Sequence, residues 1–105
     1  MRRGDVFRLG LGRRHGHEQS GVRYGVILQS DALMRLSTVL IAPTSTSARG
    51  ASFRPEIEID GTATRVLVEQ TGAVDVSRLG DYHGHLTPEQ QWGVDLALET
   101  VLDLQ

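Results

Sequence analysis

Two stretches of the chain combine strand-forming residues with polar side chains that could act on a phosphate. The first begins at Arg23 and continues into the apolar run 26–28; the second runs through Val39 to Ala42 and ends in the hydroxyl residues 44–47. Both contain the β-branched cores typical of strands. If the two strands are antiparallel neighbours, the start of one lies beside the end of the other, so the Arg23 guanidinium faces the hydroxyl cluster.

A guanidinium beside hydroxyl groups is suited to holding one phosphodiester, because arginine can donate two parallel hydrogen bonds to phosphate. Cleavage of a phosphodiester requires the attacking hydroxyl to lose a proton, the phosphoryl group to carry more negative charge and the leaving oxygen to gain a proton. Arg23 is therefore the first candidate for catalysis. The alternative is that Arg23 is an ordinary surface residue at the edge of a strand.

The order and spacing of several motifs resemble the MazF/PemK family of toxin endoribonucleases. The motifs are Arg2-Arg3-Gly4-Asp5-Val6, Glu18-Gln19 with Gly21 and Arg23, Pro43-Thr44, Glu69-Gln70, Arg78-Leu79-Gly80 and Gly84-His85-Leu86. The resemblance covers nearly the whole chain. Two positions depart from the family pattern: Tyr24 replaces the usual proline after the arginine, and Gly72 stands where many members carry a basic residue.

The resemblance implies the identity of three catalytic residues. Arg23 would act on the scissile phosphate, Thr44 would help to stabilise it, and Glu18 would orient Arg23 or assist proton transfer. Spacing alone leaves Ser45 and Thr46 open as alternatives to Thr44, and Glu18 could equally be a solvated loop acid. The implied activity is sequence-specific, ribosome-independent cleavage of single-stranded RNA by 2′-hydroxyl attack, which leaves 2′,3′-cyclic phosphate and 5′-hydroxyl ends and uses no cofactor.

The residues expected to contact RNA lie mainly in two polar loops, 12–21 and 44–52, because unpaired bases are read by side chains that line a groove. They are Arg13, Arg14, His15, His17, Gln19, Tyr24, Ser45, Thr46, Ser47, Arg49, Glu69 and Gln70. Tyr24 could stack on a base or simply pack where the family has proline. Glu69 and Gln70, expected at a strand end, could equally be exposed residues with no role.

Charge is distributed unevenly between the two halves of the chain. Residues 1–54 hold nine Arg and three acids, whereas residues 55–105 hold two Arg and ten acids. An arginine-rich first half suits a polyanion-binding face despite the acidic total.

The resemblance further implies a homodimer and a neutralising MazE-like antitoxin whose acidic, disordered tail occupies the RNA groove.

Other functions remain open on the sequence alone. A gyrase poison of the CcdB type shares the implied architecture, and the departures at Tyr24 and Gly72 are compatible with a non-catalytic barrel that binds nucleic acid or peptide. The pairs His15/His17 and His83/His85 are spaced for metal ligation or for acid–base catalysis. Because no third ligand follows in the usual arrangement, we expect no metal site.

Periodicity predicts an α+β fold that is mostly β. The expected strands are 6–11, 23–29, 37–42, 53–59, 64–69 and 81–86, and Pro43 is expected to end the third of them. Between the strands we expect a helical turn at 32–36 and a hairpin turn at Asp60-Gly61. The segment 72–80 is expected to be irregular, with a turn at 75–78. The resemblance implies a small SH3-like barrel of the CcdB/PemK type, built of antiparallel strands with a C-terminal α-helix.

The final helix has the strongest start signal in the chain. Thr87 and Gln90 form a capping box, and Pro88 suits the first helical position. We expect an apolar stripe to dock on the sheet, formed by Val94, Ala97, Leu98, Val101 and Leu104. We expect the opposite, acidic row to face solvent, formed by Gln91, Asp95, Glu99 and Asp103. Trp92 is expected in the core or at a dimer edge.

Length and composition limit the remaining possibilities. A chain of 105 residues is expected to form one domain, 1–105. The absence of cysteine excludes disulfides, thiol catalysis and cysteine metal ligands. With no apolar run long enough to span a bilayer and no hydrophobic N-terminal stretch, we expect no membrane partner and a cytoplasmic location.

Overall fold

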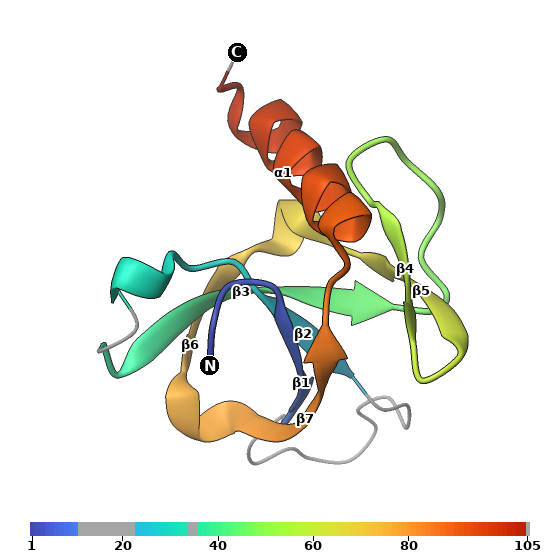
Figure 1. Ribbon diagram of the computed structural model, residues 1–105. Coiled ribbons are helices and arrows are strands. Elements are labelled where there is room, and N and C mark those ends of the chain that lie inside the picture. Colours follow the sequence, from blue (N-terminus) through green and yellow to red (C-terminus); the bar gives the residue numbers. More distant parts are fainter. Residues whose placement is uncertain (11–22, 34–35, 105) are drawn as a thin grey trace, which may run out of the picture.

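The computed structural model describes residues 1–10, 23–33 and 36–104. Within them the chain forms seven strands, three short 3₁₀ helices and one α-helix (Figure 1). In order these are β1 (Asp5–Leu9), β2 (Tyr24–Ile27), η1 (Asp31–Leu33), β3 (Thr38–Ser45), β4 (Glu56–Ile59), β5 (Thr62–Val66), η2 (Val68–Gln70), β6 (Gly72–Asp75), η3 (Val76–Arg78), β7 (Leu79–His85) and α1 (Pro88–Leu102). The fold is mostly β with a C-terminal helix, as predicted.

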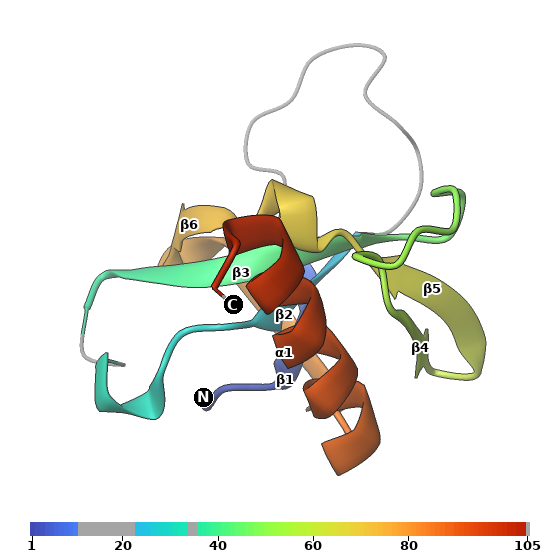
Figure 2. The ribbon, with the colours of Figure 1, turned by 90° about the horizontal axis from the view of Figure 1, so that it is seen from above.

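The strands form one curled antiparallel sheet in which β3 is the central element. The order is β4-β5-β3-β2-β1-β7, and β6 also pairs with β3. Figures 1 and 2 agree that the β4–β5 hairpin lies at one end of β3 and β6 at the other. The predicted antiparallel pairing of the two chemistry-bearing strands is confirmed, since β2 pairs with β3 with Gly25 opposite Pro43.

Pro43 does not end the third strand, contrary to the prediction. The strand continues to Ser45, and the Pro43 carbonyl accepts a 2.8 Å hydrogen bond from the Leu67 N–H. The N–H and carbonyl of one strand residue point to the same edge. On that edge β6 pairs with β3 only as far as Ile41 and β5 pairs from Thr44. The missing N–H of proline therefore falls between two partner strands, where no donor is needed.

Other predicted boundaries also required correction. The segment 72–80 is not irregular: it contains β6, η3 and the start of β7, because β6 pairs with the outer edge of β3. The expected strand 53–59 begins only at Glu56, and β5 starts at Thr62 rather than at 64. Glu69 and Gln70 belong to η2 and not to a strand end. The hairpin turn is confirmed, with positive φ at Asp60 and Gly61.

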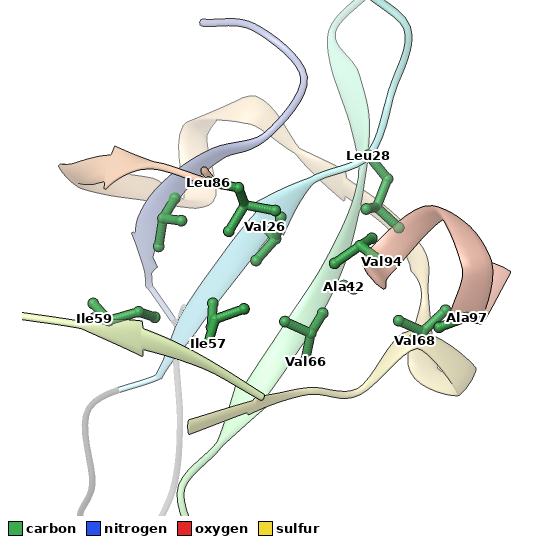
Figure 3. Close-up of a cluster of buried hydrophobic side chains, with 11 residues drawn as sticks. Val26, Leu28, Ala42, Ile57, Ile59, Val66, Val68, Leu86, Val94 and Ala97 are labelled. Carbon is green, nitrogen blue, oxygen red and sulfur yellow. The ribbon is translucent and has the colours of Figure 1, made fainter. Parts of the chain in front are cut away.

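The core occupies both faces of the sheet, because successive strand residues point in opposite directions. On one face Val26 and Ala42 pack with residues of β4, β5 and α1 (Figure 3). On the other face Ile27 and Ile41 pack with Leu9 and Val39. A sheet covered on both faces gives β2 and β3 a fixed position, and with it the residues at their adjoining ends.

The helix α1 begins with the predicted capping box of Thr87 and Gln90. Its apolar stripe docks only in part: Val94 and Ala97 are buried, whereas Val101 and Leu104 are 36% and 63% exposed. The last turns project away from the sheet in Figure 1, so they have no surface to cover. Trp92 is 67% exposed, which rules out the core position.

The acidic row of α1 is not simply solvated. The Asp95 carboxylate accepts a 2.8 Å hydrogen bond from the Arg3 guanidinium and a 3.0 Å hydrogen bond from the Gln91 amide. Asp95 therefore ties the N-terminal segment to the helix, whereas Glu99 and Asp103 are exposed as predicted. Among the described residues, no helix has the length and apolar character needed to cross a membrane.

Candidate functional site

A pocket of about 530 Å³ lies where the end of β3, the start of β2 and the β4–β5 hairpin meet. We call it the hydroxyl pocket, because most of its lining side chains carry a hydroxyl group. It is lined by Arg23, Tyr24, Thr44, Ser45, Thr46, Ser47, Ile59, Thr62, Thr64, Leu67 and Gln70. Among the described residues that line it, Arg23 is the one that carries a charge, and the others are neutral, most of them with hydrogen-bonding groups.

Arg23 and Thr44 are in direct contact at the pocket. The antiparallel register that sets Gly25 opposite Pro43 brings the residue before β2 alongside the end of β3. The Arg23 Nε donates a 3.1 Å hydrogen bond to the Thr44 carbonyl oxygen. In the described part of the chain the two terminal guanidinium nitrogens have no hydrogen-bond partner, which leaves both for a ligand.

The Thr44 hydroxyl is buried but weakly bound. Thr44 is 2% exposed, and its Oγ1 donates to the Tyr24 carbonyl oxygen at 3.4 Å. This distance lies beyond the usual range for an O–H···O bond. The Thr44 hydroxyl is therefore held only loosely by its partner in the pocket lining.

A second, smaller pocket lies on the other side of Arg23. It has a volume of about 220 Å³ and is lined by Leu9, Arg23, Ile41, Pro43, Gln70, Gly72, Ala73, Val74 and Arg78. We call it the apolar pocket. Arg23 and Gln70 line both pockets, so a phosphate held by Arg23 would have a hollow on each side. A Cβ added at Gly72 would meet only the Gln70 carbonyl oxygen, at 4.0 Å, so the missing side chain leaves this pocket open.

The hydroxyl groups that line the hydroxyl pocket differ in their hydrogen-bond partners. Ser45 and Ser47 hydrogen-bond to each other at 3.3 Å, and Thr46 is exposed to water. Thr64 is 5% exposed, and its Oγ1 has no hydrogen-bond partner among the described residues. A buried hydroxyl without a partner costs about 1–3 kcal/mol. The pocket thus contains one unsatisfied polar group in its wall.

Sequence reasoning missed Thr62 and Thr64 as lining residues. The available signal was the alternation in the β4–β5 hairpin. Thr64 stands opposite the buried Ile57 and two residues before the buried Val66, which makes it a polar residue at an inward-facing position. Such a position is normally apolar.

Glu69 holds the loop beside the pocket and does not line the pocket itself. Its Oε2 accepts hydrogen bonds of 2.8 and 2.6 Å from the Arg54 Nε and Nη2. These bonds hold the pKa of Glu69 below its ordinary value. Arg54 Nη1 also donates to the Arg49 carbonyl at 3.2 Å, and Arg65 Nη1 donates to the Arg54 carbonyl at 3.0 Å. Arg49 is exposed and also lies outside the pocket lining.

The structure brings together part of the predicted site. Tyr24, Thr44, Ser45, Thr46, Ser47 and Gln70 line the hydroxyl pocket with Arg23. Six predicted residues lie outside the described residues: the catalytic candidate Glu18, and the RNA-contact candidates Arg13, Arg14, His15, His17 and Gln19.

His83 and His85 each pair with a different acid. His83 Nδ1 lies 2.7 Å from Asp60 Oδ2, and its ring packs edge-on against Tyr24 with 4.9 Å between centroids. His85 Nδ1 lies 2.8 Å from Asp5 Oδ1. Across residues 1–10, 23–33 and 36–104 no three His, Asp or Glu residues are grouped so as to hold a metal ion. These histidines therefore support the strands around the pocket.

Comparison with known proteins gives consistent matches over the whole chain. Residues 2–102 match the family described as the PemK-like, MazF-like toxin of type II toxin–antitoxin systems. A Mycobacterium tuberculosis protein is 42% identical over 104 residues, which cover 97% of both chains. Endoribonuclease EndoA of Bacillus subtilis is 33% identical over 99% of this chain and 96% of its own.

Among solved structures, a mycobacterial endoribonuclease in complex with its cognate antitoxin superimposes with a TM-score of 0.82 at 25% identity. The superposition covers 100% of this chain and 97% of the other. The curled sheet and C-terminal helix described above are therefore an arrangement that the two chains share.

Proposed function

Because this chain belongs to the PemK-like, MazF-like toxin family of type II toxin–antitoxin systems, we propose that it is an endoribonuclease that cleaves single-stranded RNA. The single observation that carries the proposal is the position of Arg23. Its Nε donates to the Thr44 carbonyl oxygen, its side chain lines the hydroxyl pocket, and its terminal nitrogens have no hydrogen-bond partner in the described part of the chain.

In the proposed mechanism the scissile phosphate binds at the Arg23 guanidinium. The 2′-hydroxyl loses its proton and attacks the phosphorus, the bond from phosphorus to the 5′-oxygen breaks, and the leaving oxygen takes a proton from water. The products then carry 2′,3′-cyclic phosphate and 5′-hydroxyl ends. The guanidinium and the Thr44 hydroxyl stabilise the negative charge that develops on the phosphoryl oxygens. Because Nε is already bound to Thr44, the guanidinium is oriented before RNA arrives, which reduces the reorganisation needed in the transition state.

Proton transfer is assigned to the polar residues around this phosphate. Glu18 precedes Arg23 by five positions, and we assign to it either orientation of Arg23 or help in moving the 2′-hydroxyl proton. No metal or other cofactor takes part in the proposed reaction. Cleavage is proposed to be independent of the ribosome and specific for a short sequence, which side chains of the loops 12–21 and 44–52 would read.

We further propose a homodimer and a MazE-like antitoxin. The related mycobacterial structure is that of an endoribonuclease with its cognate antitoxin. An acidic, disordered segment of such a partner would compete with RNA for the arginine-rich first half of the chain, which holds nine of the eleven basic residues.

Two other functions can be separated by one pair of assays on the purified protein. A long single-stranded RNA is incubated with the protein, and the supercoiling activity of DNA gyrase is measured in parallel. Fragmented RNA with active gyrase supports the proposal. Intact RNA with stalled supercoiling supports a CcdB-like gyrase poison, and intact RNA with active gyrase leaves a non-catalytic binding module.

A further inference from the structure

The buried hydroxyl of Thr64 has no role in the fold that the described residues reveal. It lies in β5 on the inward side of the sheet, between Thr62 and Val66, and its Oγ1 is without a partner in the described part of the chain. Buried polar groups in folded proteins are nearly always hydrogen-bonded, and each exception calls for an explanation. A valine would fill the same volume without leaving a polar atom unsatisfied.

The pocket that Thr64 lines has the chemistry of a site for an unpaired nucleobase. Ile59 and Leu67 supply an apolar surface for the face of a ring, and the side chain of Tyr24 supplies an aromatic one. The exposed amide of Gln70 can both donate and accept hydrogen bonds. A base edge needs both kinds of partner. Among the described residues of the lining, Arg23 carries the one charge and none is a carboxylate that would repel the RNA backbone.

We propose that the hydroxyl pocket receives the nucleobase next to the scissile phosphate and that Thr64 contacts its polar edge. The inference rests on the proposed function, because it takes the phosphate to be held at Arg23. The Thr64 hydroxyl can serve as donor or acceptor and can move between staggered positions about χ1. A base whose edge carries a hydrogen-bonding group at this position gives the Thr64 oxygen the partner it lacks. A base without such a group there leaves the buried hydroxyl without a hydrogen bond.

This arrangement makes Thr64 a specificity-determining residue rather than a structural one. The hydroxyls of Ser45 and Ser47 are bound to each other, and Thr46 and Thr62 are exposed, so water satisfies them when no base is present. Thr64 is shielded from water, so its hydroxyl gains a hydrogen bond only from a matching ligand. It should therefore distinguish between bases more strongly than the exposed hydroxyls of the pocket do.

The test is Thr64→Val, which removes the hydroxyl and keeps the shape. The variant is expected to be at least as resistant to urea as the wild type, because an unsatisfied buried hydroxyl is lost. Cleavage sites are then mapped by sequencing the fragments of a long single-stranded RNA. We expect preference at one position beside the cut to fall about 10-fold, with the other positions unchanged.

Two variants control for packing and for a general loss of hydroxyls. Thr64→Ser keeps the hydroxyl and should retain the preference at that position. Thr38→Val removes an exposed hydroxyl at the far end of β3, outside both pockets, and should leave the cleavage pattern unchanged. If Thr64→Val cuts the same sites with the same preference as the wild type, the inference is wrong and the proposed function stands.

A binding measurement keeps the inference testable if the wild type does not cut RNA at all. Fluorescence anisotropy is measured with short oligomers of A, C and U, each made as a 2′-deoxy analogue that lacks the proposed nucleophile. The inference predicts that the wild type prefers one base about 10-fold and that Thr64→Val binds all three alike. Equal discrimination by the two proteins would overturn the role of Thr64 whatever the outcome for cleavage.

Discussion

The Nε of Arg23 donates a 3.1 Å hydrogen bond to the carbonyl oxygen of Thr44, which joins the start of β2 to the end of β3. The bond uses the inner nitrogen of the guanidinium and a backbone acceptor, so it fixes the direction of the side chain without neutralising its charge. Neither terminal nitrogen has a hydrogen-bond partner among the described residues, so both can donate to a phosphate. The catalytic proposal depends on this geometry.

Thr44 should be the hydroxyl residue on which cleavage depends. Thr44→Val is expected to lower the cleavage rate about 10²-fold, because it removes one donor to the phosphoryl oxygens. Ser45→Ala and Thr46→Val should stay close to the wild type, since Ser45 bonds to Ser47 and Thr46 is exposed. Single-turnover rates on one RNA decide the matter. A normal rate for Thr44→Val, with a large loss in either neighbour, would move the catalytic role to that neighbour.

Gly72→Lys should tighten RNA binding and make it more sensitive to salt. A side chain at this position enters open space beside the apolar pocket, and a lysine there adds one charge close to Arg23. One further phosphate contact steepens the dependence of log K on log salt by about 0.7 for single-stranded RNA. Anisotropy titrations over a range of salt concentrations measure this slope. Gly72→Ala is the neutral control, and an equal slope for both variants would show that no phosphate passes this position.

Breaking the pair of Arg54 and Glu69 should change how stability depends on pH. The Arg54 hydrogen bonds lower the pKa of Glu69 from its ordinary value of 4.5. A lowered carboxyl pKa in the folded state stabilises the protein above pH 4.5, and this stabilisation is lost as the pH falls through the lower, folded-state value. Glu69→Gln should therefore cost about 1.5–3 kcal/mol at neutral pH.

Urea denaturation at a series of pH values measures this effect. The difference between the wild type and Glu69→Gln should shrink as the solution becomes acidic, because the wild-type carboxyl is then also neutral. Glu58→Gln removes an exposed acid on β4 and serves as the matched control. Parallel pH curves for the wild type and Glu69→Gln would contradict the assignment.

The two described histidines should be dispensable for chemistry. His83 and His85 are each bound to a carboxylate and lie outside the linings of both pockets. His83→Gln and His85→Gln should therefore cleave RNA at close to the wild-type rate. Loss of a general acid or base lowers the rate by about 10²–10⁴-fold. A loss of that size in either variant, with normal stability, would reinstate a histidine mechanism.

The parts of the structure that the sequence predicted well are those set by neighbouring residues or by a single pairing. Thr87, Pro88 and Gln90 define the helix start within four positions, and the capping box forms as expected. The contact of Arg23 with the end of β3 required only that two predicted strands be antiparallel neighbours, and they are.

The features that the sequence did not predict depend on tertiary contacts. Whether Pro43 ends a strand depends on where β5 and β6 meet the edge of β3, which no local pattern encodes. The pairing of Arg54 with Glu69 joins residues 15 positions apart through the fold of a loop. Val101 continues the apolar period of α1 yet is exposed, because the last turns project away from the sheet, and Leu104 lies beyond the end of the helix, which Asp103 caps in the left-handed conformation.

The most direct test of the account compares the wild type with Arg23→Ala and Arg23→Lys on a long single-stranded RNA in EDTA, followed by analysis of the fragment ends. Arg8→Ala, an exposed arginine of β1 outside both pockets, is the control for charge. The account predicts 2′,3′-cyclic phosphate and 5′-hydroxyl ends for the wild type and Arg8→Ala. It also predicts a loss of at least about 10²–10³-fold for Arg23→Ala, which Arg23→Lys does not restore because lysine lacks the planar fork. Undiminished cleavage by a folded Arg23→Ala protein, or fragments with other ends, would contradict it.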